Sequence, residues 1–394
     1  MITKLKISNF RSIRKQEIEL SKINIFYGPT SSGKSSVLYS LIVVKNFIKN
    51  PNQSIDGFFN LGFLNLGGFD ACVFNHEFNS AMKIGFSTND GEYEVSFKKQ
   101  EGKIIQKLDE VEMMANIPIP YPLNKNFQFD FGEEYTINWN GLIANVVPKQ
   151  PSPQTQQKAR ELTEKLNSIP STLDGVDIIP HRRGFFKPVY SPSHVSILPC
   201  TEDEIATIII NDPYLAPKIS ADIEKIINRD FRTYVPPGTA TVYFQITDKS
   251  IRLPIELVNE GFGVNQLIYL LAKIHRQGIK TILIEEPEIH LHPKVIRALV
   301  RTLISITKEE DKQFLIVTHS ELFVTSLLTA IVEKLIYPQE IKLYLVEKKG
   351  KETVILEQKT NEEGQVEGGL ESFISAELED LKIFLNRKKD NNKE

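Results

Sequence analysis

The residues from Gly28 to Ser35 match the pattern G-x-x-x-x-G-K-[ST] with the sequence Gly-Pro-Thr-Ser-Ser-Gly-Lys-Ser. Glycines let the backbone curl so that successive N–H groups point at phosphate oxygens. In this pattern the ammonium of Lys34 lies on the β- and γ-phosphates, and the hydroxyl of Ser35 completes a Mg²⁺ shell. The segment therefore predicts a site for a nucleoside triphosphate and magnesium.

The flanks of this loop provide the context that the pattern requires. A short β-prone run, Ile23 to Phe26, comes just before it, and apolar residues recur at helical spacing across 34–49. Such a helix adds the positive end of its dipole to the anion site. An incidental Gly/Ser loop is the alternative, but strand, loop and helix together favour phosphate binding.

Two carboxylates, Glu285 and Glu286, follow the apolar run Ile282 to Ile284. In open α/β sheets ligands bind at the carboxyl ends of the strands. The first acid can hold Mg²⁺ or its water shell, and the second can orient and deprotonate an attacking water. A solvated acidic loop is the alternative reading of this pair. Joined to a phosphate loop, the pair predicts a hydrolytic site.

A second apolar run, Phe314 to Val317, ends in Thr318-His319-Ser320. A single histidine after a strand is more often structural than catalytic. Here its strand follows the acidic one, so we expect His319 to sense the γ-phosphate.

The composition of the 394-residue chain is that of an ordinary globular protein, with 41% apolar and 25% charged residues. A net charge of −3 means that contact with DNA requires a local basic patch. Two cysteines argue against a disulfide framework, and no apolar run approaches the roughly 20 residues that span a bilayer. The start of the chain lacks the apolar region of a signal peptide. We therefore expect a soluble, cytoplasmic protein with no membrane partner.

Periodicity predicts an α/β fold. Alternating apolar residues indicate strands over 2–27 and an antiparallel meander over 81–107, whereas 108–200 is irregular and rich in proline. A helical pair is expected at 202–228, strands at 240–246 and 250–257, and alternating helices and apolar strands from 263 onward. We divide the chain into an N-terminal ATPase lobe (1–107), an inserted cap (108–230), a C-terminal ATPase lobe (231–386) and a disordered tail (387–394).

Several of these motifs together resemble those of ABC-type AAA ATPases on the RecF and SMC side, and specifically the ATPase part of the overcoming-lysogenization-defect family. The similar segments cover roughly half of the chain. They are the first strand at 7–13, the Q-loop region at 67–70, the signature segment at 259–266, the acidic motif at 285–293 and the switch histidine at 318–320.

The resemblance implies a mixed sheet with an antiparallel β subdomain and a compact cap. It also implies a head-to-tail homodimer that closes over ATP and Mg²⁺ and reopens on hydrolysis. It gives Glu286 and His319 catalytic roles and places Ser35, Asp70 and Glu285 at the metal. The residues implied to hold ATP are Arg11, Gly28, Pro29, Thr30, Ser31, Ser32, Gly33, Lys34, Ser35 and Ser36, with Gly261, Gly263 and Asn265 reaching it from the partner copy.

Three positions depart from the family pattern. The loop has Thr30 where Asn is usual, the signature has Gly261 or Phe262 where Ser is usual, and the acid at the metal is Glu285 where Asp is commoner. Asn265 or backbone N–H groups would then replace the missing signature serine. Slow hydrolysis is one expectation from these changes.

The chain lacks sustained heptads, which excludes long coiled-coil arms. The basic and aromatic run His181 to Lys187 is a candidate for contact with nucleic acid. Alternatively, Arg182 and Arg183 pair with local acids or approach the nucleotide. The segment Leu343 to Glu347 imitates the start of a toprim nuclease domain, but a strand of the ATPase sheet is the favoured interpretation. His290 and His292 have no third ligand nearby, so zinc is not expected there.

Three functions remain open from the sequence. The first is an ATPase switch that acts on DNA in repair or in defence against mobile elements. The second is an ATPase sensor whose effector, a nuclease or toxin, is another protein. The third is a module that binds ATP with little hydrolysis.

Overall fold

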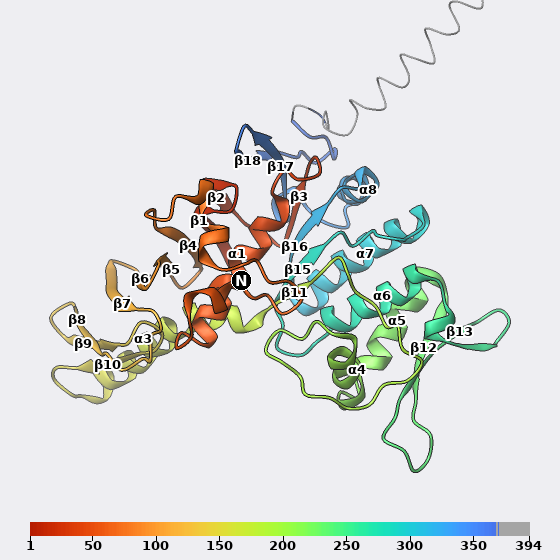
Figure 1. Cartoon of the computed structure of the whole chain (residues 1–394), viewed down its shortest axis with the longest axis horizontal. Helices are drawn as coiled ribbons and strands as arrows, with labels where there is room; N and C mark the ends of the chain where they lie inside the picture. Colours follow the sequence, from red (N-terminus) through yellow and green to blue (C-terminus); the bar gives the residue numbers. More distant parts are fainter. Residues whose placement is uncertain (368, 370–394) are drawn as a thin grey trace, which may run out of the picture.

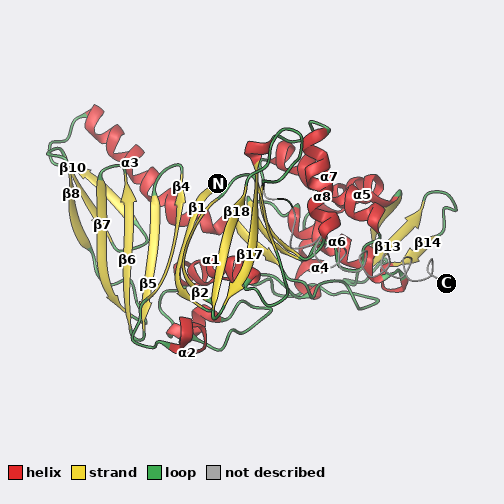
Figure 2. Cartoon of the chain, turned by 90° about the horizontal axis from the view of Figure 1, so that it is seen from above, coloured by secondary structure: helices red, strands yellow, loops and turns green. Residues whose placement is uncertain are grey.

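The computed structural model describes residues 1–367 and residue 369. The expected tail at 387–394 and the expected end of the C-terminal lobe at 386 lie outside the described residues. Two six-stranded sheets dominate the described part of the chain, with helix α1 (Lys34–Lys49) packed between them (Figures 1 and 2). In this part of the chain, every helix is too short or too polar to cross a lipid bilayer.

The first sheet is antiparallel, in the order β2-β1-β4-β5-β6-β7. Its strands are β1 (Ile2–Phe10), β2 (Ile13–Glu19), β4 (Met82–Thr88), β5 (Glu92–Lys98), β6 (Glu101–Leu108) and β7 (Val111–Pro118). Buried apolar residues alternate with polar residues along the strands, so one face of the sheet packs inward and the other face is polar. The predicted meander at 81–107 is confirmed, and it continues by one strand.

The second sheet is mixed, in the order β11-β15-β16-β3-β17-β18. All neighbours are parallel except β17 and β18. Its strands are β11 (Val176–Ile179), β15 (Thr281–Glu285), β16 (Gln313–Thr318), β3 (Ile23–Tyr27), β17 (Ile341–Lys349) and β18 (Glu352–Gln358). Every residue of β15, β16 and β3 is buried, as the continuous apolar runs predict. The carboxyl ends of these three strands therefore meet at one edge.

The remaining elements cover the mixed sheet or extend the antiparallel one (Figure 1). The helices are α2 (Phe69–Cys72), α3 (Pro153–Ser171), α4 (Glu202–Asn211), α5 (Leu215–Ile227), α6 (Phe262–Ile274), α7 (Pro293–Glu310) and α8 (Glu321–Val332). One small sheet joins β8 (Phe127–Phe131), β9 (Tyr135–Trp139) and β10 (Ala144–Pro148), and another joins β12 (Arg229–Tyr234), β13 (Tyr243–Asp248) and β14 (Pro254–Glu256). The helical pair expected at 202–228 is confirmed.

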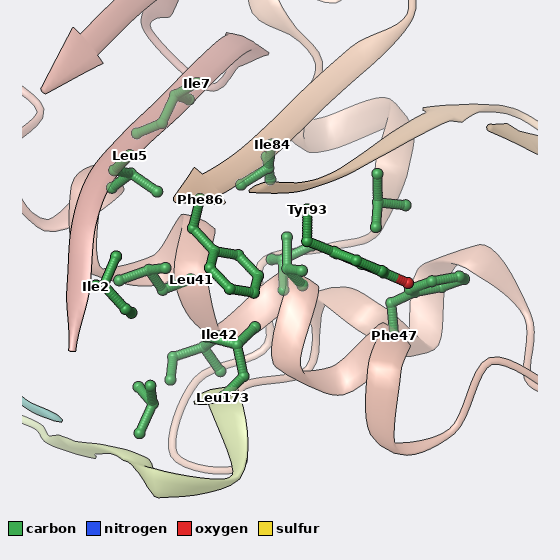
Figure 3. Packing of buried hydrophobic residues seen from close by; sticks show 14 of the residues in the cluster. Ile2, Leu5, Ile7, Leu41, Ile42, Phe47, Ile84, Phe86, Tyr93 and Leu173 are labelled. Atoms are coloured by element: carbon green, nitrogen blue, oxygen red, sulfur yellow. The ribbon is translucent and has the colours of Figure 1, made fainter. Parts of the chain in front are cut away.

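Helix α1 is buried along most of its length because apolar side chains surround it. Figure 3 shows Leu41, Ile42 and Phe47 from α1 against Phe86 and Tyr93 from the antiparallel sheet. Fully burying a side chain of this size stabilises the fold by roughly 1.5–3 kcal/mol. This packing fixes the helix that begins at the phosphate loop.

Strand pairing crosses the domain boundaries expected from the sequence. Strand β7 pairs with β6 although 108 was taken as the start of a cap, and β11 pairs with β15 in the mixed sheet. Buried strands need such neighbours because their backbone N–H and C=O groups must be satisfied. The segment from β8 to α3 shares the hydrophobic core of the antiparallel sheet. The division into two ATPase lobes and an inserted cap remains a proposal, and the strand pairing crosses its boundaries.

Candidate active site

A pocket of about 430 Å³ lies at the edge where β3, β15 and β16 end. It brings together the phosphate loop, the acidic motif and the switch histidine, which are far apart in the sequence. Its lining residues are Arg11, Ser12, Ser31, Gly33, Lys34, Ser35, Ser36, Glu286, Val317, His319 and Lys348. The geometry thus assembles the centre of the predicted site within one chain.

Lys34 is the buried cation of this pocket, with 4% of its surface exposed. Its Nζ donates to the carbonyl oxygens of Gly28 at 3.0 Å and Pro29 at 2.6 Å, and to Ser32 Oγ at 3.4 Å. Burial lowers the pKa of Lys34 to about 8, against the opposing effect of the Glu286 carboxylate. The ammonium therefore lacks a full counter-charge, which a bound phosphate would supply.

The hairpin of β17 and β18 holds the phosphate loop in place. A Cβ on Gly28 (φ 143°) would lie 2.2 Å from the carbonyl oxygen of Val346, and one on Gly33 (φ 100°) would lie 2.3 Å from Thr353 Oγ1. Thr353 Oγ1 donates to the carbonyl of Ser32 at 2.7 Å and lies 2.7 Å from Ser12 Oγ. Only glycine fits this conformation and these close approaches.

Glu286 and His319 face each other across the pocket. His319 Nε2 lies 3.4 Å from Glu286 Oε1. Burial and then the charge of Lys34 lower the pKa of His319, so its imidazole is neutral near pH 7. Glu288 accepts from Thr318 Oγ1 at 2.6 Å and from the N–H of His319 at 3.2 Å, and this fixes the backbone at the histidine.

Glu285 lies behind Glu286, next to the first turns of α1. The hydroxyl of Tyr39 donates to Glu285 Oε1 at 2.7 Å and also bonds with Ser35. Glu285 Oε2 is buried and has no hydrogen-bond partner among the described residues, with His181 Nδ1 at 3.6 Å. A buried carboxylate oxygen without a partner, on a residue linked to Ser35 through the hydroxyl of Tyr39, belongs to a donor set that suits Mg²⁺.

Arg183 binds the backbone of the acidic motif and was not identified as a site residue from the sequence. Its guanidinium donates to the carbonyl oxygens of Glu285 at 2.7 Å and Glu286 at 2.8 Å. Burial lowers the pKa of Arg183 to about 10, and the nearby Glu288 opposes the shift. In the same segment Lys187 pairs with Asp203 at 2.5 Å. Arg183 thus contacts the backbone of the acidic motif and Lys187 contacts an acidic side chain, and contact of this run with nucleic acid stays a prediction.

Lys348 and Ser12 also reach the pocket without having been predicted. Lys348 is exposed near the end of β17, which runs parallel to β3 and leaves the sheet at the same edge. It is the third cation of the pocket, after Arg11 and Lys34. The one usable signal in the sequence was the strand-like segment at 343–347.

The signature segment lies at the start of α6 and outside this pocket. Gly261 faces open space, and Phe262 is 63% exposed. A Cβ on Gly263 would lie 2.4 Å from the carbonyl oxygen of His290, so this glycine lets α6 approach the acidic motif. Asn265 is only 3% exposed. Both ends of its amide are engaged by the backbone of Phe185, so in this conformation it cannot reach a nucleotide.

Asp70, the residue expected at the metal from the Q-loop region, is exposed on the short helix α2. It does not line the pocket, and its carbonyl oxygen lies 3.3 Å from His76 Nδ1. Its role at the metal therefore remains a prediction that this conformation does not assemble. Thr30 is exposed at the tip of the loop.

A phosphate loop, an acidic strand end and a histidine in one pocket of a mixed sheet define a P-loop nucleotide site on an α/β fold. The AAA ATPase domain family matches residues 1–324. The chain therefore belongs to the AAA ATPase domain family, as its motifs predict.

Two curated proteins show distant similarity. The chain is 22% identical over 332 residues to an OLD nuclease of Thermus scotoductus, an alignment that covers 82% of this chain and 60% of that protein. It is 21% identical over 358 residues to an ATP/GTP phosphatase of Helicobacter pylori, covering 85% of this chain and 89% of that protein. The chain thus spans about 60% of the length of the OLD nuclease.

Among solved structures, SMC heads match the chain over most of its length. The SMC head domain from Thermotoga maritima matches with a TM-score of 0.46 and 13% identity, over 90% of this chain and 98% of that one. An SMC head bound to the C-terminal winged-helix domain of ScpA matches with a TM-score of 0.49 and 12% identity, over 91% and 97%.

Proposed function

We propose that the protein hydrolyses ATP with Mg²⁺ in a head-to-tail homodimer. The observation that carries this proposal is the pocket in which Lys34, Glu286 and His319 converge on one site. Lys34 supplies a buried positive charge for the phosphates, and the two other groups face the position of a γ-phosphate.

The chemistry follows from these three groups. Glu286 accepts a proton from a water that attacks the γ-phosphorus, while the bond from phosphorus to the β–γ bridging oxygen breaks and ADP leaves. The neutral imidazole of His319 donates a hydrogen bond to a γ-phosphate oxygen. Ser35 and Glu285 would hold Mg²⁺, which neutralises charge on the phosphates.

The dimer is inferred because the signature segment does not line the nucleotide pocket of its own chain. Gly261 and Gly263 do not line it, and the start of α6 is exposed at Phe262. In a head-to-tail pair, the backbone N–H groups at the start of one α6 would close over the nucleotide of the other chain. ATP would then favour the closed dimer, and hydrolysis would release it.

The test uses the Glu286→Gln variant, in size-exclusion chromatography with light scattering, with and without Mg-ATP. This variant loses the base but keeps the phosphate loop, so we expect ATP binding, a fall in turnover of at least about 100-fold, and a shift from monomer to dimer. The matched control is Glu94→Gln, a carboxylate on the antiparallel sheet. A monomer at saturating ATP would refute the dimer, and unchanged phosphate release would refute the role of Glu286.

A second candidate is an ATPase module that controls an effector. The observation behind it is the similarity of this chain to an OLD nuclease over 332 residues. A nuclease or toxin on another chain would then respond to the ATP state. Copurification of such an effector with the tagged Glu286→Gln protein, lost on removal of ATP, supports this candidate. DNA remains the alternative target.

A further inference from the structure

The exposed face of the antiparallel sheet carries a regular row of lysines. The strand register places one residue from each strand side by side across the sheet, and every second one is a lysine. In order from β2 to β7 these residues are Lys15, Ser8, Lys83, Ser96, Lys103 and Asn116. We call Lys15, Lys83 and Lys103 the lysine row. Since neighbouring strands lie about 4.8 Å apart, these lysines recur about every 10 Å and span about 19 Å.

A hollow of about 670 Å³ lies at one end of this row. Lys98, Lys103 and Lys125 line it, together with the polar side chains of Ser96, Gln100 and Asn116. The acid in its lining is Glu101. The hollow therefore adds two lysines to the end of the row.

These lysines form no ion pairs within the described part of the chain, although Glu17, Glu94 and Glu101 lie on the same face of the sheet. On the adjacent part of the same face, Lys4 pairs with Glu19 at 2.7 Å, Lys6 with Glu92 at 2.8 Å and Lys107 with Glu112 at 2.7 Å. By contrast, no lysine of the row, nor Lys98 or Lys125, forms an ion pair with any residue in 1–367.

These lysine side chains also cannot turn into the interior behind the sheet. The opposite face of the same strands is filled by Ile7, Ile84, Val95 and Ile104, which are fully buried. A charge turned into this core would be costly, so the lysines stay in solvent. The result is a solvent-facing row of lysines on a protein whose net charge is −3.

We propose that the lysine row and the hollow bind the phosphate backbone of a nucleic-acid duplex. Lysine, serine, asparagine and glutamine are the residue types that contact phosphates. Within the described chain, no aromatic side chain belongs to the row or lines the hollow, so bases have nothing to stack on. This favours a duplex over a single strand. Binding is independent of base sequence, and it goes beyond the ATPase proposal because the surface lies outside the nucleotide pocket.

The test compares two triple variants that remove the same number of charges. One variant, called the row variant, carries Lys83→Gln and Lys103→Gln from the row and Lys98→Gln from the hollow. The control carries Lys308→Gln, Lys334→Gln and Lys359→Gln, which are exposed elsewhere. Fluorescence anisotropy follows a short labelled duplex between about 50 and 200 mM salt. Because each phosphate contact contributes about 0.9 to the salt slope, the row variant should lower it by about 3 and weaken binding at least tenfold. The control should bind like the wild type.

The outcomes separate this proposal from its rivals. Equal duplex affinity of the row and control variants overturns it, as does the absence of salt-dependent duplex binding by the wild type. Tighter binding of a labelled single strand, of poly-glutamate or of anionic vesicles overturns the choice of a duplex. Thermal unfolding and phosphate release should match the wild type, which keeps the test independent of the ATPase. If the row variant fails to fold, Lys103→Gln alone should lower the slope by about 1.

Discussion

Glu286 adopts a left-handed backbone conformation with φ of 46°, and its N–H donates to the carbonyl of Val317 at 2.8 Å. A non-glycine residue held in this region costs of order 1 kcal/mol or more, and such residues gather at functional sites. Here the conformation turns the carboxylate of Glu286 into the pocket while Glu285 stays buried beside Tyr39. The two adjacent acids are thereby given different surroundings.

Lys348 provides a test of the pocket at the residue scale. Lys348→Met removes a charge that lines the site and touches no other described partner, so the affinity for ATP should fall about tenfold with little change in kcat. Titration with a fluorescent ATP analogue and steady-state kinetics measure the two effects. The neighbouring Lys349 does not line the pocket, and Lys349→Met is the control. Equal affinities for the two variants would exclude Lys348 from the nucleotide site.

Local motifs predicted the centre of the site and missed its supports. The phosphate loop, Glu286 and His319 are recognised by short spacing around each residue. Tyr39, Arg183 and Thr353 carry no such pattern, because their roles depend on contacts made 246, 102 and 321 residues away. For the same reason, the sequence of the signature segment could not predict that Asn265 is buried against Phe185.

At the scale of elements, long periodic segments were predicted and short edge strands were not. Helices α1 and α7 and strands β15 and β16 follow from their apolar spacing. Strand β11 has four residues and pairs with β15, about 100 positions later. A run that short has no period to read, and its partner alone makes it a strand.

An ionic cluster joins α5, α6 and the end of α7. His275 Nε2 lies 2.7 Å from Asp222 Oδ2, and its Nδ1 lies 2.9 Å from Glu310 Oε1. Burial alone would lower the pKa of His275, but the two carboxylates outweigh it and raise the pKa above 6.5. Burial would raise the pKa values of both acids, but hydrogen bonds from His275 hold them below 3.8 and 4.5. Lys225 and Lys312 also pair with these acids.

The cluster predicts how stability depends on pH. The contribution of His275 is complete below pH 6.5 and is lost as pH rises through its raised pKa. That of the acids is present above about pH 4.5 and is lost as pH falls through their lowered pKa values. His275→Gln should therefore destabilise the fold most between these limits, by about 3 kcal/mol. Urea unfolding of both proteins across pH 5–9 measures this. A difference that does not shrink with rising pH would contradict the charged state of His275.

At the scale of the whole molecule, the exposed aromatic ring at the start of α6 is the surface that a second copy would cover. Phe262 lies 6.2 Å from Phe186 and 6.1 Å from His290, ring to ring. Phe262→Asp should weaken ATP-dependent association at least tenfold without changing ATP binding by the monomer, since burying a charge is costly. Ile251→Asp is the control, because Ile251 is 64% exposed on the loop between β13 and β14. Light scattering with Mg-ATP compares the two. Similar dimer fractions would place the interface elsewhere.

Strand β3 leaves the ribosome early, but its neighbours in the mixed sheet are β16 and β17, which end at residues 318 and 349. At roughly 10 residues per second, β3 waits about half a minute for both partners. The antiparallel sheet is complete by residue 118 and can shelter α1 during this interval. The nucleotide pocket, in contrast, is completed by Lys348, and Thr353 bonds to the phosphate loop. The complete pocket is therefore available to the nascent chain only when nearly all of the described protein has been synthesised.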